Sequence, residues 1–131
     1  MAETAEPQGT TVRLSFQPLP VHVRTARLVA VTVARRAGWA EEQVESVRQA
    51  VGEACALALR AAAGRDAVTL ELDDADPAGD LVAWVAPVTD VPRSSDVGED
   101  ALLRAVLAGL THDVSVVPRR GRPALRLVWS R

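Results

Sequence analysis

The stretch that decides the fold is residues 41–64, EEQVESVRQAVGEACALALRAAAG, in which apolar side chains recur at steps of three and four residues. This spacing is typical of one face of an α-helix. The face consists of Val44, Val47, Val51, Ala54, Ala58 and Ala62. Because these side chains are small, the helix is expected to pack closely against its neighbours. Glu41 and Glu42 occupy the first turn, where carboxylates interact favourably with the helix dipole, and Gly64 ends the pattern.

Segments on both sides of this helix show either a two-residue alternation, typical of strands, or a helical spacing. The expected strands are 12–16, 68–72, 81–88, 114–117 and 124–129, and the other expected helices are 21–37 and 100–110. The order of elements is therefore β-α-α-β-β-α-β-β. Because strands and helices do not alternate regularly, this order predicts an α+β fold, with a mixed or antiparallel sheet and helices on one face.

Each of the two flanking helices has an expected inward face. The inward residues of helix 21–37 are Val21, Leu28, Val31 and Ala34, and those of helix 100–110 are Leu102, Leu103, Val106 and Leu110. Val29 and Val33 widen the apolar stripe of the first of these helices, so we expect it to be covered on more than one side.

Length and composition indicate one folded domain. The chain has 131 residues, of which 48% are hydrophobic, and this length fits a single domain. We expect residues 1–11 to be a flexible N-terminus and residues 12–131 to form the domain. The net charge of −2 gives no electrostatic footprint for nucleic acid or anionic lipid. With no secretory signal and no stretch long enough to span a membrane, the expected location is the cytoplasm.

Several residue types that carry chemistry are absent or rare. The sequence contains no lysine and no asparagine, which excludes a Walker-type phosphate lysine and an asparagine ligand. The single cysteine, Cys55, excludes an intrachain disulfide and a cysteine-based metal cluster built from this chain alone. No cation is evident beside Cys55, so we expect it to be a small buried thiol.

Residues 53–62, EACALALRAA, resemble the N-box helix of the anti-sigma factor kinases, which reads roughly Glu-Ala-Cys-x-Asn-Ala-x-Arg-His. These kinases are the small bacterial branch of the GHKL (histidine kinase-like) ATPases. The likeness extends to residues 34–55, ARRAGWAEEQVESVRQAVGEAC, and 113–129, DVSVVPRRGRPALRLVW, and covers residues 12–129. It implies a two-layer α/β sandwich of the GHKL (Bergerat) type. It also implies a family role in sequestering a sigma factor and phosphorylating its antagonist.

The resemblance implies roles for particular positions of this helix. In the family the N-box Glu is the general base, and the Asn four residues on supplies an oxygen to Mg²⁺, since a step of four places both on one helix face. Glu53 is retained at the first position, as a vestigial general base. Leu57 stands at the Asn position and Ala61 at the following His position. Because these side chains offer no oxygen to a hard cation, no metal site is expected here.

Two further nucleotide-binding elements of the family are also substituted. The Asp-x-Gly-x-Gly element, whose Asp recognises the adenine amino group, falls on Pro87 and Thr89, and a frame shifted to Asp90 restores no glycine. The Gly-x-Gly that binds phosphates through backbone N–H groups falls on Ala101 and Leu103. No two glycines in the chain are spaced as Gly-x-Gly. We therefore expect no cofactor; a functional family site would instead take ATP and Mg²⁺.

Three hypotheses follow. The first is an anti-sigma-factor-like regulatory protein of bacterial transcription with lost or impaired ATP binding and kinase activity. It would bind a sigma factor or an anti-sigma antagonist and pair as a homodimer through the sheet edge. The second is an active ATP-dependent serine kinase of antagonist proteins, with Glu53 as base and metal ligands drawn from Asp90, Asp96 or Glu99. The third is a small-molecule or structural module that shares only the fold, which an apolar pocket beside Leu57 would favour.

Three arginines, Arg119, Arg120 and Arg122, cluster in the expected turn between the last two strands. A basic hairpin tip is more often a solvated turn, although it is also suited to contact with an acidic partner. Both interpretations stay open from the sequence.

Overall fold

The computed structural model describes residues 11–74, 79–89 and 99–131 of the chain. Its elements in chain order are β1 (Thr11–Phe16), the 3₁₀ turn η1 (Pro20–His22), α1 (Val23–Arg36), α2 (Glu41–Ala62), β2 (Val68–Asp73), β3 (Leu81–Ala86), α3 (Glu99–Leu110), β4 (Asp113–Arg119) and β5 (Arg122–Trp129). The predicted order of strands and longer helices is confirmed. Of the segment 1–11 that we expected to be flexible, only Thr11 is described, and it begins β1.

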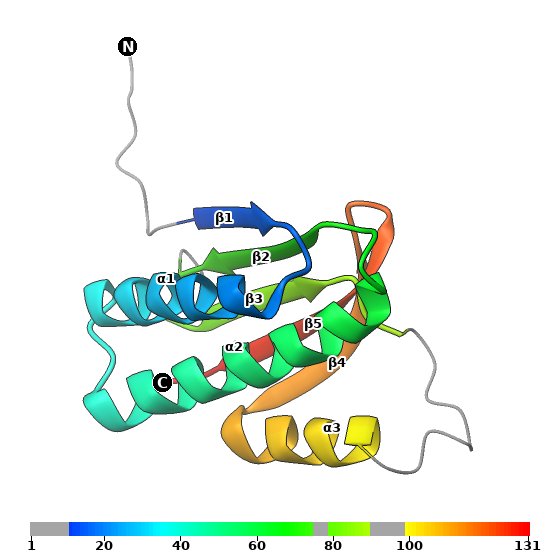
Figure 1. Ribbon diagram of the computed structural model, residues 1–131. Coiled ribbons are helices and arrows are strands. Elements are labelled where there is room, and N and C mark those ends of the chain that lie inside the picture. The colour runs from blue at the N-terminus through cyan, green and yellow to red at the C-terminus, as the bar shows by residue number, and fades with distance from the viewer. Residues whose placement is uncertain (1–10, 75–78, 90–98) are drawn as a thin grey trace.

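The five strands form one sheet in the order β1-β2-β3-β5-β4, and each neighbouring pair is antiparallel. The three helices lie on one side of this sheet and give the molecule two layers (Figure 1). The two-layer α+β sandwich expected from the sequence is therefore confirmed, with the antiparallel form of the sheet. Among the described strands, β1 and β4 are the two edges.

Helix α2 supplies the centre of the core. All six residues of its predicted inward face are buried, with no more than 2% of any of them exposed. Ala26, Ala30 and Ala34 of α1 are also fully buried, and α1 packs against α2. In the part of the chain that the structure describes, no helix is both long and apolar enough to cross a membrane.

The predicted inward face of α1 is wrong at two of its four positions. Val31 and Ala34 are buried, but Val21 is 70% exposed and Leu28 is 61% exposed. Val21 belongs to η1, which precedes the helix, so its angular position does not follow the 3.6-residue period of α1. Leu28 points outward because Ala26, Ala30 and Ala34 occupy the buried side of the helix.

The predicted face of α3 is also rotated relative to the observed one. Leu107 is completely buried, and Leu103 and Leu110 pack against the core in half-buried positions. Leu102 is instead 65% exposed and Val106 is 39% exposed. The observed face follows the steps of four and three residues between these three leucines, so the prediction was correct for Leu103 and Leu110 and wrong for Leu102 and Val106.

The hairpin of β4 and β5 is longer than predicted, because the two prolines in it do not end the strands. Pro118 of β4 and Pro123 of β5 stand directly opposite each other. Because proline has no backbone N–H group, both missing donors fall at the same position between the two strands. Only Arg120 and Gly121 form the turn, both with positive φ, at 51° and 81°. This two-residue connection matches the right-handed twist of the strands. Strand β3, in contrast, ends two residues earlier than predicted, directly before Pro87.

Leu107 and Leu102 form a matched pair of test positions, since they lie on the same helix but differ in burial. Leu107→Ala is expected to lower the free energy of unfolding by about 2–5 kcal/mol, because it removes buried methyl groups and leaves a cavity. Leu102→Ala should change it by no more than about 0.5 kcal/mol. Urea unfolding followed by circular dichroism measures both values. Equal losses would contradict the described orientation of α3.

Candidate functional site

A cavity of about 310 Å³ lies in the helix layer beside Glu53. Its lining comes from all three helices: Arg27, Arg48, Gln49, Glu53, Val106 and Leu110. Glu53 is half-buried in the middle of α2. Of the site residues singled out from the sequence, only Glu53 lines this cavity. The structure thus places the proposed vestigial base at a recess that also contains two guanidinium groups.

Arg27 reaches this cavity from α1 because α2 has a glycine opposite it. A Cβ atom on Gly52 would lie 2.5 Å from Nε of Arg27, so only glycine leaves room for the guanidinium group in this position. Cys55 is fully buried, as expected, and its burial raises the pKa of the thiol to about 12 although the positive charge of Arg27 lowers it in part. Arg27 is therefore a nearby cation that sequence reasoning missed, since it belongs to a different helix. Cys55 stays a protonated, enclosed thiol at neutral pH.

The two substituted N-box positions follow Glu53 along α2. Leu57 is 5% exposed and belongs to the apolar core, whereas Ala61 is half-buried. Both side chains consist only of carbon and hydrogen. Among the described residues, no three His, Cys, Asp or Glu side chains lie close enough together to hold a metal ion. This face of α2 therefore offers packing surface and no oxygen ligands.

The positions predicted to replace the adenine-binding element follow β3. Pro87 is buried and Thr89 is exposed. The segment is fixed at two points by hydrogen bonds, since the Val88 N–H donates to the Pro123 carbonyl at 3.1 Å and Arg104 Nη2 donates to the Thr89 carbonyl at 2.9 Å. The second bond connects this segment to α3, so the end of β3 and the third helix are held together.

The positions predicted to replace the phosphate-binding element lie in the first turns of α3. Ala101 is exposed and Leu103 packs against the core. Asp90 and Asp96, considered as metal ligands of an active kinase, lie outside the described residues, and so does the side chain of Glu99. The structure brings α2 and α3 together at the cavity beside Glu53, but Leu57, Pro87, Thr89, Ala101 and Leu103 do not line it.

A family model matches nearly the whole described domain. The model of the histidine kinase-like ATPase domain matches residues 16–129, which includes every described helix and all strands after β1. The chain belongs to the histidine kinase-like ATPase family. No curated protein matches the sequence. The superfamily implied by the N-box resemblance is therefore confirmed, while the anti-sigma branch stays a prediction.

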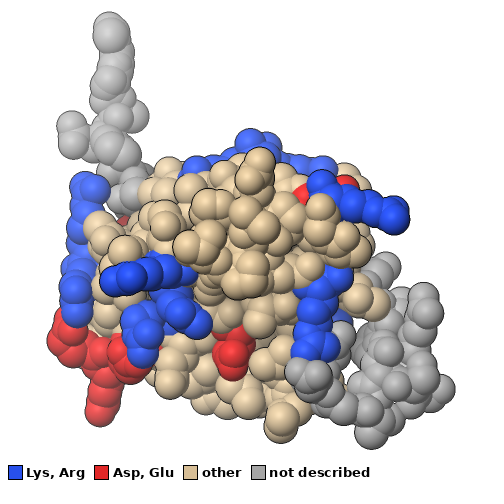
Figure 2. All heavy atoms as spheres, viewed as in Figure 1, with Lys and Arg blue, Asp and Glu red and all other residues tan. Residues whose placement is uncertain are grey.

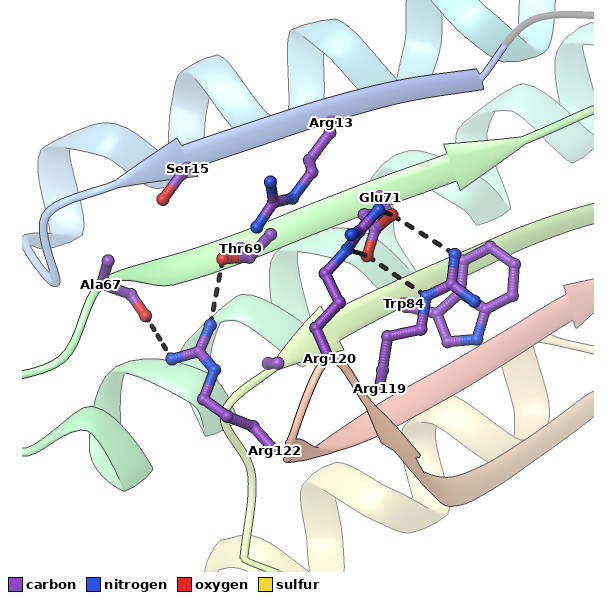
Figure 3. Close-up of a pocket in the computed structure, with 10 residues that line it drawn as sticks. Arg13, Ser15, Ala67, Thr69, Glu71, Trp84, Arg119, Arg120 and Arg122 are labelled. Carbon is purple, nitrogen blue, oxygen red and sulfur yellow. Dashed lines mark hydrogen bonds and ion pairs between the residues drawn. The ribbon is translucent and has the colours of Figure 1, made fainter.

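This histidine kinase-like ATPase domain has a second cavity, of about 290 Å³, on the face of the sheet that carries no helices. Its centre is Glu71, whose outward side chain is only 3% exposed (Figure 3). Arg119 donates to the two carboxylate oxygens from Nε at 3.2 Å and Nη2 at 3.3 Å, and Arg120 does so at 3.0 and 3.1 Å. These bonds from two guanidinium groups lower the pKa of Glu71 to about 2.

The arginines of the β4–β5 hairpin therefore fold back onto the sheet, although the Arg120 side chain stays 56% exposed. The turn is solvated, as the first interpretation has it, but its arginines also contact the sheet. The Arg119 guanidinium lies 3.9 Å from the centre of the Trp84 ring. Arg122 donates to the Ala67 carbonyl at 2.8 Å and to Oγ1 of Thr69 at 3.0 Å. Sequence reasoning missed the role of Glu71. The available signal was a carboxylate at an outward position of a strand in which almost every residue is buried.

The pKa of Glu71 makes the stability of the domain depend on acid pH. Its folded pKa of about 2 lies below the ordinary value of 4.5, so the stabilisation is complete above pH 4.5 and is lost as the pH falls toward 2. Glu71→Gln is expected to cost about 1–3 kcal/mol at pH 7, because it removes a hydrogen-bonded charge. The difference in unfolding free energy between wild type and variant should shrink between pH 4.5 and 2.

Urea unfolding at a series of pH values measures this difference. Glu45→Gln is the control, since Glu45 also pairs with an arginine, Arg48, but at an exposed position of α2. The Glu45→Gln substitution should lower the free energy of unfolding at pH 7 much less than Glu71→Gln does. An equal effect of the two substitutions would contradict a stabilising role of the buried carboxylate.

Proposed function

We propose that this chain is an anti-sigma-factor-like regulatory protein of bacterial transcription that acts by protein–protein binding, with lost or impaired ATP binding and kinase activity. The observation that carries the proposal is the position of Leu57, 5% exposed in the core, where the resemblance places a magnesium ligand. Magnesium requires oxygen ligands in near-octahedral geometry. A leucine enclosed by apolar neighbours supplies none.

The helix side of the domain has a surface suited to a protein partner. Leu28 of α1 is 61% exposed, and it lines a groove together with Val31 and with Arg24, Arg27 and Arg48. Figure 2 shows a broad uncharged area on this side, bordered by groups of basic side chains and, along its lower margin, by acidic ones. Exposed apolar side chains with a polar rim are typical of protein-binding surfaces. The proposed partners are a sigma factor or an anti-sigma antagonist, and a second copy of the chain could pair through the sheet edge.

One observation favours the second candidate, an active ATP-dependent serine kinase. Glu53 lines a cavity that contains the guanidinium groups of Arg27 and Arg48, and such groups stabilise transferred phosphates. The third candidate, a small-molecule module, depended on an apolar pocket beside Leu57. Leu57 instead lies in the filled apolar core, which counts against that candidate.

Thermal unfolding with nucleotide separates the first two candidates. Millimolar Mg²⁺-ATP or Mg²⁺-ADP is expected to leave the melting temperature unchanged, because the family contacts are substituted. A ligand at 100 times its dissociation constant would stabilise the fold by about 2.7 kcal/mol, which corresponds to a rise of several degrees. Such a rise, together with phosphate transfer to an antagonist that Glu53→Ala abolishes, would contradict the proposal and establish the kinase.

The proposed partner surface is tested by placing a charge on it. Leu28→Asp is expected to weaken binding to purified sigma factors or antagonists at least tenfold, because it replaces the exposed apolar side chain of the groove with a charged one. Leu102→Asp is the matched control, since Leu102 is 65% exposed on α3, away from the groove. Surface plasmon resonance measures both affinities. Wild-type protein that binds neither class of partner would contradict the proposed function.

A further inference from the structure

We propose that the cavity around Glu71 is a binding site for an acidic peptide segment of a protein partner. It lies on the opposite side of the sheet from the α1 surface, so this proposal does not depend on the proposed function. The residues that would bind the segment are Arg13, Arg119, Arg120 and Arg122. They come from β1 and from the tip of the β4–β5 hairpin, two segments that are distant in sequence.

The charge of this cavity is opposite to that of the whole chain. Four guanidinium groups and one carboxylate line it, a surplus of three positive charges, whereas the chain has a net charge of −2. The only carboxylate, Glu71, is shared by two arginines. Concentrated charge of one sign in a recess attracts a ligand of the other sign and orients its approach.

The cavity already contains the recognition chemistry that the proposal requires. Arg119 and Arg120 each bind the Glu71 carboxylate with two parallel N–H donors, the geometry that makes arginine selective for carboxylates. A guanidinium group has five donors, so each of these arginines retains donors after binding Glu71. Arg122 donates only to neutral oxygen atoms, and its charge is not balanced by them.

Arg13 is the arginine most available to a ligand. It stands on the edge strand β1 directly opposite Glu71, and its guanidinium group points over β2 (Figure 3). Within the described part of the chain, it takes part in no hydrogen bond and no ion pair. The hairpin arginines reach Glu71 from the side opposite to β1, so the cationic groups flank the space above β2. The volume of about 290 Å³ corresponds to roughly ten water molecules, which is more than one carboxylate fills.

A peptide fits this cavity better than a nucleic acid. Nucleic acids are bound through long basic tracks, but the surplus charge here is confined to one recess on an acidic chain. Bases of single strands stack on open aromatic rings, and the Trp84 ring is instead covered by the Arg119 guanidinium. Carboxylate side chains on an extended segment need neither feature.

The test uses a fluorescein-labelled hexaglutamate peptide and the full chain, with fluorescence anisotropy at low and rising salt concentration. Wild-type protein is expected to bind the peptide, and Arg13→Glu is expected to weaken binding at least tenfold. Because the new carboxylate would stand directly opposite Glu71, the melting temperature of each variant is measured first, and binding is compared at a temperature at which all proteins are folded. Arg36→Glu, an exposed change of the same charge on α1, is the control and should alter binding less than threefold.

Three outcomes would overturn the proposal. The first is the absence of peptide binding by wild-type protein. The second is an equal effect of Arg13→Glu and Arg36→Glu, since the attraction would then be non-specific. The third is tighter binding of a labelled single-stranded oligonucleotide than of hexaglutamate with the same sensitivity to Arg13→Glu, which would make the cavity a nucleic-acid site. A Glu53→Ala protein should bind the peptide like wild type, so a failed ATP or kinase experiment does not affect this result.

Discussion

The close contact between α1 and α2 determines the arrangement of the helix layer. Both helices bury alanines, and fully buried methyl groups such as those of Ala30 and Ala58 take little space in the core between the helices and the sheet. Two further features of the helix layer accompany this packing. Leu28, the largest apolar residue of α1, is left on the outside, and Arg27 can lie over Gly52 and bring a positive charge to the cavity beside Glu53.

Strand alternation then divides the sheet into an apolar face and a charged face. In β2, Leu70 and Leu72 are completely buried under the helices, while Glu71 between them points to the opposite side. A carboxylate that is only 3% exposed loses most of its hydration, which is costly unless opposite charges replace the water. Arg119 and Arg120 do so together, and they thereby attach the β4–β5 hairpin to a strand that is not its neighbour in the sheet.

Sequence reasoning predicted those features that depend on local patterns. The order of elements and the buried face of α2 follow from periodicity alone, and both are confirmed. The predicted faces of α1 and α3 were partly wrong. Val21 belongs to η1 and not to the regular turns of α1, and the buried face of α3 is shifted by one residue, from Leu102 and Val106 to Leu103 and Leu107. The cluster around Glu71 could not be predicted, since its arginines lie 48 and 49 residues away in the chain and only the sheet brings them together.

Leu57 connects the stability of the fold with the proposed loss of nucleotide binding. A fully buried leucine side chain stabilises a protein by about 1.5–3 kcal/mol relative to an exposed one. An asparagine at the same position would need a metal, water or protein partner, and without one it would cost about 1–3 kcal/mol. In a protein that binds nucleotide, the ligand compensates for that cost. In a protein that acts through its surfaces, leucine gives the more stable core, so the residue at this position fits a scaffold that is kept for binding proteins.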